Sequence, residues 1–109
     1  MAYALVLLLL VGCSAAPAIG PPGTQTQTAR GVLLDVVSPS IRQLDRFTLR
    51  ADDGQLMTFV ADANFNAGAA HMMTPGHMRQ HMALADPVIV TYRLENGILV
   101  ALSATDANN

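Results

Sequence analysis

The chain has 109 residues, which is enough for one small domain and too few for two independent cores. Its formal net charge is -2, and its six basic residues, all arginines, are scattered among eight acids. This distribution gives no clustered positive face, so we expect no nucleic-acid partner.

The first segment, residues 1–12, is an apolar run of the length of a signal-peptide core. It is well short of the roughly 20 residues that a membrane-spanning helix needs, so it predicts export. An ordinary secretory signal would be cleaved after a small residue near Ala16. The single cysteine, Cys13, follows this run directly and excludes an internal disulfide and any cysteine-based zinc site.

Leu-Val-Gly-Cys at residues 10–13 resembles the lipobox of bacterial lipoproteins, in which the cysteine is lipidated and becomes the mature N-terminus. The resemblance implies that Cys13 is the lipid attachment site. It also implies an extracytoplasmic protein of the bacterial cell envelope, anchored to the cell membrane or the outer membrane. One departure from the pattern is that no Lys or Arg precedes the apolar run.

Residues 13–28 follow the signal and contain three prolines, two glycines and no charged residue. This composition predicts a disordered tether with a typical reach of about 20 Å. The folded domain is expected over residues 29–105, and residues 106–109 are expected to fray.

Alternating or branched apolar residues predict five strands, at residues 31–37, 44–51, 55–62, 88–95 and 98–104. Asp53-Gly54 and Asn96-Gly97 each predict a two-residue hairpin turn, because these residue types accept positive φ. Between the third and fourth strands, Thr74 is a predicted N-cap with Pro75 at the first helical position. This helix should end at Asp86, because a residue before proline avoids the helical region.

The element order predicts a mainly β fold, a small five-stranded OB-like barrel with one helix between strands three and four. Over residues 30–103 the chain resembles the small exported OB-type proteins of bacteria, on element order and turns. An open antiparallel sheet with one packed helix is the alternative fold.

Histidines and methionines cluster around the predicted helix, and they suggest a metal site. His77 and His81 are four residues apart, a spacing that places two imidazoles on one helix face, and His71 is a possible third ligand from the preceding loop. Imidazole with thioether is a soft ligand set suited to copper(I), and the sulfurs would come from Met78 and Met82. Exported OB-fold copper chaperones also use histidine and methionine, but their ligands lie on strands beside a tryptophan, and this sequence has no Trp.

The simpler interpretation makes Met78 and Met82 core residues of an amphipathic helix whose histidines border the barrel rim. No nucleophile lies beside an oriented base in a recognisable motif, so we expect no enzyme. The favoured function is a lipid-anchored, non-catalytic interaction module of the cell envelope without a cofactor, binding an unidentified protein or envelope ligand. The alternative is a transition-metal protein that holds a copper or zinc ion.

Overall fold

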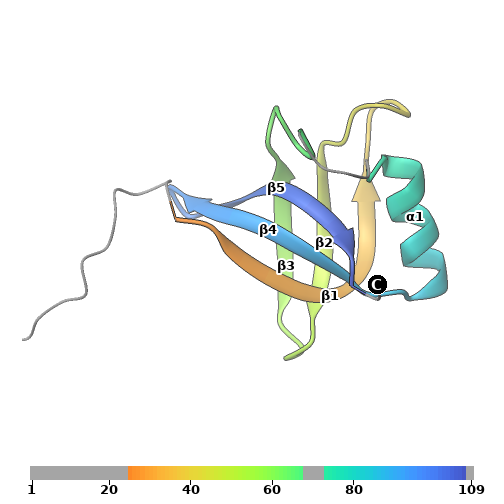
Figure 1. Ribbon diagram of the computed structural model, residues 1–109, viewed down its shortest axis with the longest axis horizontal. Coiled ribbons are helices and arrows are strands. Elements are labelled where there is room, and N and C mark those ends of the chain that lie inside the picture. Colours follow the sequence, from red (N-terminus) through yellow and green to blue (C-terminus); the bar gives the residue numbers. More distant parts are fainter. Residues whose placement is uncertain (1–24, 68–72, 108–109) are drawn as a thin grey trace, which may run out of the picture.

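Five strands and one helix make up the computed structural model, which describes residues 25–67 and 73–107 (Figure 1). In chain order the elements are β1 (Gln27–Val37), β2 (Arg46–Ala51), β3 (Leu56–Ala61), α1 (Pro75–Leu84), β4 (Val88–Glu95) and β5 (Ile98–Asp106). The strands pair in the order β1-β2-β3-β5-β4, and β1 also pairs with β4. The sheet is therefore a closed barrel, which confirms the predicted OB-like fold and rejects the open sheet.

Strand β1 closes the barrel because its first half pairs with β4 and its second half with β2. It begins at Gln27 instead of residue 31, since the pairing with β4 is a long-range contact that no local pattern reveals. The β1–β2 register shifts between Leu33 and Asp35, so the chain carries one extra residue there. This bulge turns Leu33 and Val36, three residues apart, into the same buried interior.

Aromatic rings fill the middle of the barrel. Phe47 and Phe59 lie opposite each other on β2 and β3 and stack with centroids 5.2 Å apart. The ring of Tyr92 on β4 meets Phe59 edge-on, also at 5.2 Å. The predicted alternation of β2 and β4 is confirmed at these positions, because the inward-facing residues are the buried ones.

The two predicted hairpin turns have different outcomes. Asn96 and Gly97 both have positive φ, 51° and 79°, as a two-residue primed turn requires. Gly54 also has positive φ, 88°, but its amide donates to the carbonyl of Ala51, and the Ala51 amide donates to Gln55. The β2–β3 connection is therefore a three-residue loop ending in glycine, and the two-residue prediction is wrong there.

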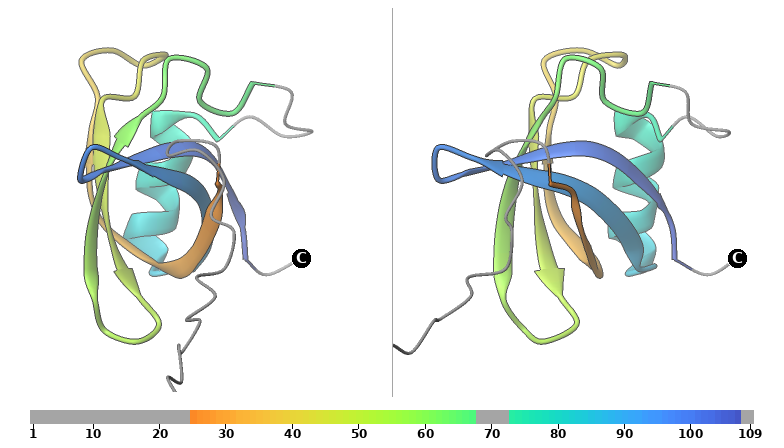
Figure 2. Two further views of the ribbon diagram at one scale, coloured as in Figure 1. Left: turned by 90° about the vertical axis from the view of Figure 1, so that its left-hand side faces the viewer. Right: turned by 60° about the vertical axis from the view of Figure 1, so that its left-hand side comes forward.

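Helix α1 lies across one end of the barrel, as the views in Figure 2 show. Thr74 is the N-cap, and its hydroxyl accepts a hydrogen bond from the amide of His77 at 3.1 Å. The helix ends at Leu84, earlier than predicted, because Ala85 adopts a left-handed conformation with φ of 53°. Within the described residues, no helix is long and apolar enough to cross a membrane.

Two predicted site residues, Cys13 and His71, lie outside the described residues. The signal segment 1–12 and most of the tether 13–28 also lie outside them. Lipid attachment at Cys13 and metal ligation by His71 therefore stay predictions.

Candidate metal centre

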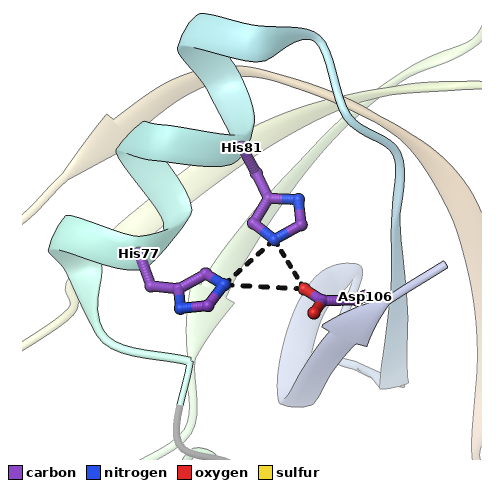
Figure 3. Close-up of side chains that lie close together, drawn as sticks. All are labelled: His77, His81 and Asp106. Atoms are coloured by element: carbon purple, nitrogen blue, oxygen red, sulfur yellow. Dashed lines mark hydrogen bonds and ion pairs between the residues drawn. The ribbon is translucent and has the colours of Figure 1, made fainter. Parts of the chain in front are cut away.

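His77 and His81 lie side by side on α1, as their four-residue spacing predicts (Figure 3). Their imidazole rings are stacked, with centroids 4.9 Å apart and an angle of 17° between the planes. The two Nε2 atoms are 3.0 Å apart. The helix therefore presents two potential nitrogen ligands at one point.

Asp106, the last residue of β5, completes the cluster from the other side. Its Oδ1 atom lies 2.5 Å from Nε2 of His81 and 3.6 Å from Nε2 of His77. Strand β5 reaches this far because Asp106 pairs with Val88 at the start of β4. The predicted frayed tail at 106–109 is therefore wrong at Asp106, since cross-strand pairing orders it.

The Oδ1 atom of Asp106 is buried, yet it has no hydrogen-bond partner among the described residues. Buried polar atoms without a partner are rare because they lose their hydration without compensation. Such an atom, directed at two imidazole nitrogens, marks a position where a cation would be stabilised. The other groups in contact with it are the two histidines, which carry a positive charge only when protonated.

The spacing of the three ligand atoms suits a transition-metal ion. Ligands of a tetrahedral ion with bonds of about 2.0–2.1 Å lie roughly 3.3 Å apart, and the three distances here are 2.5, 3.0 and 3.6 Å. A triangle with these sides has a point about 1.8 Å from every corner, so an ion slightly above the plane would have ordinary bond lengths. The side chains need little movement to bind one.

The second ring nitrogen of His81, Nδ1, contacts the backbone just after the helix. The Nδ1 atom lies 3.4 Å from the backbone carbonyl of Asp86, which can accept a hydrogen bond but cannot donate one. Asp86 is fixed in turn because its amide donates to the carbonyl of His81 at 3.0 Å, and the left-handed Ala85 allows this return. A carbonyl at Nδ1 favours the tautomer whose Nε2 lone pair is free for a metal.

The cluster is reachable from solvent. The side chain of His81 is 11% exposed, whereas those of His77 and Asp106 are 43% and 44% exposed. A pocket of about 320 Å³ borders His81 and Asp106 and is otherwise lined by Gln80, Leu84, Asp86 and Pro87. An ion from solution therefore has a path to all three ligand atoms.

The methionines predicted as weaker ligands lie on the core side of the helix. Met78 is fully buried in the hydrophobic core, and Met82 is partly buried and packs against it. Their structural interpretation as amphipathic-helix core residues is the one that the packing supports. Of the predicted ligands, the structure thus brings together His77 and His81.

Buried Asn66 positions both parts of the cluster. Its Nδ2 donates to the carbonyl of Met73, just before α1, and its Oδ1 accepts from the amide of Ala104 on β5. The amide of Asn66 also donates to the carbonyl of Leu102. Asn66 therefore holds the start of the helix and the end of β5 together, and sequence analysis missed it within an irregular loop.

A second group of charges, on the barrel wall, is self-contained. Arg93 contacts Asp62 at 3.1 Å and Glu95 at 3.0 Å. The amide of Asn64 donates to Asp62, and together with Arg93 it lowers the pKa of Asp62 below the ordinary value of 3.8. The pKa of Arg93 is raised, mainly by its hydrogen bond to Glu95. Both carboxylates are paired with Arg93, so this group does not suggest a ligand site.

Comparison with known proteins gives a limited result. No protein-family model matches the chain, and no curated protein matches it. A crystal structure of Ag(I)CusF covers 76% of this chain and 99% of its own, with 11% identity and a TM-score of 0.49. Apo-CusF from Escherichia coli covers 83% of this chain and 99% of its own, with 12% identity and a TM-score of 0.48. A likeness at this level transfers neither site residues nor an activity to this chain.

The expectation of a protein without a cofactor is corrected by the cluster itself. His77, His81 and Asp106 each offer one ligand atom, and these atoms lie within 4.8 Å of one another. Asp106 is the ligand that sequence analysis missed. The Asn96-Gly97 turn gives only part of the signal, because counting the β4–β5 pairs outward from it extends β5 to Thr105, one residue short of Asp106.

Proposed function

We propose that this protein binds a transition-metal ion through His77, His81 and Asp106, and that this is its biochemical task. The observation that carries the proposal is the convergence of two Nε2 atoms and the buried Oδ1 atom of Asp106. Two histidines at i and i+4 with a carboxylate from another element form a common three-ligand set for such ions. The role is binding and not catalysis, in keeping with the absence of a nucleophile motif in the sequence.

An ion pair between protonated His81 and Asp106 is the main alternative explanation for the cluster. It would join α1 to β5 without any metal. This arrangement accounts for the 2.5 Å contact, but it leaves His77 with its Nε2 atom 3.0 Å from that of His81. A metal ion accounts for all three atoms, because each then donates a lone pair to the same centre.

The test is a metal titration of the purified full chain followed by calorimetry and thermal unfolding. We expect one ion per chain, and an ion at a hundred times its Kd should add about 2.7 kcal/mol to the free energy of unfolding. His81→Ala should abolish both effects. The matched control is Ala83→Ser, an exposed position on the same helix outside the pocket lining, which should bind as the parent does.

Two results would reject the proposal. One is a parent protein that binds no transition metal while folded. The other is a His81→Ala variant that keeps the stoichiometry and the metal-dependent stabilisation of the parent.

We further propose that the protein acts outside the cytoplasm, attached to a membrane through a lipid on Cys13. The support is the Leu-Val-Gly-Cys sequence at the end of an apolar run. Labelling with an acyl-chain probe in a bacterial host tests the anchor. A Cys13→Ala protein that stays labelled and membrane-bound would reject it.

A further inference from the structure

We infer that the centre takes a borderline divalent ion, Zn²⁺ or Cu²⁺, in preference to a soft monovalent ion such as Cu⁺ or Ag⁺. The inference rests on the proposed function and names the class of ion. It depends on two independent features, the chemistry of the third ligand and the location of the sulfur atoms, and the tautomer of His81 supports metal ligation in general.

The third ligand is a carboxylate oxygen. Asp106 contributes a hard, anionic donor, and hard donors favour divalent over soft monovalent ions. Its Oδ1 atom is buried beside both imidazoles, so an ion bound by the imidazoles would also compensate the charge of this carboxylate. A divalent ion meets this negative charge with an excess of positive charge, whereas a monovalent ion only equals it.

The sulfur atoms that a soft ion would select are committed to the core. Met73 and Met78 are buried, and Met82 packs against the same cluster of side chains. A thioether ligand would have to leave this packed interior and open a cavity there. Among the described residues the ligand set is therefore two nitrogens and one oxygen.

The tautomer of His81 matches that of metal-ligating imidazoles in general. At such sites the non-ligating ring nitrogen donates to a carbonyl or carboxylate, which orients the ring and raises its basicity. The carbonyl of Asp86 occupies this position beside Nδ1 of His81. Because it is a backbone group held by the helix end, the orientation exists before an ion binds.

The experiment compares Zn²⁺, Cu²⁺ and Ag⁺ on the full chain, with Ag⁺ as the probe for soft monovalent ions. Competition titrations in a chloride-free buffer give the three affinities. We expect Zn²⁺ and Cu²⁺ each to bind at least about tenfold more tightly than Ag⁺. Loss of an outer-shell partner alone typically costs 10–100-fold, so Asp106→Asn should weaken Zn²⁺ binding by more than about tenfold.

Two further variants sharpen the comparison. Asp106→Met replaces the oxygen with a thioether and should reverse the order in favour of Ag⁺. Met82→Leu removes a core sulfur of similar volume and should leave all three affinities unchanged. Circular dichroism confirms that each variant is folded, and the parent competition alone decides the order if a variant is not.

The outcomes separate this inference from the function on which it rests. Tighter binding of Ag⁺ than of Zn²⁺ and Cu²⁺, or loss of Ag⁺ binding in Met82→Leu, overturns the preference for divalent ions and leaves metal binding standing. If neither divalent ions nor Ag⁺ bind to the folded parent, the metal-binding proposal fails together with the inference.

Discussion

The two sides of helix α1 differ in what holds them. The core side, with Met78 and Met82, packs against residues of the barrel interior, and nonpolar burial stabilises it. The adjacent side, with His77 and His81, meets Asp106 of β5, and the side chain of His77 there is partly open to solvent. Substitutions on the core side should therefore change mainly the free energy of unfolding. Substitutions of the histidines should change mainly the metal affinity.

The largest expected effect concerns the core side. Met78 is fully buried, so Met78→Ala should lower the free energy of unfolding by about 2–5 kcal/mol through lost burial and a cavity. Met78→Leu keeps the volume and should cost less than about 1.5 kcal/mol. Chemical denaturation of the metal-free protein measures both. If Met78→Leu abolished metal binding in a stable fold, the separation of the two sides would be wrong.

Asn66 joins the chain just before α1 to β5. Its replacement should therefore lower both the free energy of unfolding and the metal affinity. Asn66→Ala leaves the carbonyl of Met73 and the amide of Ala104 without their partner, and each unsatisfied buried group costs about 1–3 kcal/mol. We expect a loss in this range or above it, with weaker metal binding in titrations. Exposed Asn64→Ala is the control and should change stability by less than about 0.5 kcal/mol. An Asn66→Ala protein with parental metal affinity would show that the cluster is positioned by other contacts.

Replacing Thr74 should have a smaller effect on stability, because Thr74 only caps the helix. Thr74→Ala removes the acceptor for the amide of His77 and should cost about 1 kcal/mol. Thr74→Ser retains the hydroxyl and should restore most of that loss. Thermal unfolding of the metal-free variants measures the difference, and equal stability of the Ala and Ser variants would contradict the assigned cap.

The smallest expected effect on stability concerns Asp62, which lies on the barrel wall away from the helix. The pKa of Asp62 is lowered in the folded state, so its carboxylate stabilises the fold above the ordinary value of 3.8. That contribution should be lost as the pH falls through 3.8 towards the lower folded-state pKa. Asp62→Asn should therefore reduce the acid dependence of stability below about pH 4. Denaturation at several pH values checks this, and an unchanged acid slope would mean that Asp62 adds nothing measurable.

Local patterns were sufficient for the barrel strands and for two of the three ligands of the site. Alternation identified the buried residues of β2 because side chains in a strand change face at every residue. The four-residue spacing of His77 and His81 placed their rings together because a helix repeats every 3.6 residues. The β2–β3 loop was predicted one residue too short, since Gly54 suits both turn types and long-range pairing chooses between them.

By itself, the sequence determined the order of the strands and the helix along the chain, the Asn96-Gly97 turn, and the placement of two histidines on one helix face. Only the tertiary structure decided which residue of β5 meets them. Uninterrupted pairing from that turn would set Thr105 opposite Val88, but the register shifts beside Thr91, and Asp106 takes that place. The unpaired residue at the shift is Leu102, whose carbonyl accepts from the amide of Asn66, a residue distant in sequence. Because a shift of one residue exchanges the two faces of a strand, this shift places the carboxylate of Asp106 at the histidines in place of the hydroxyl of Thr105.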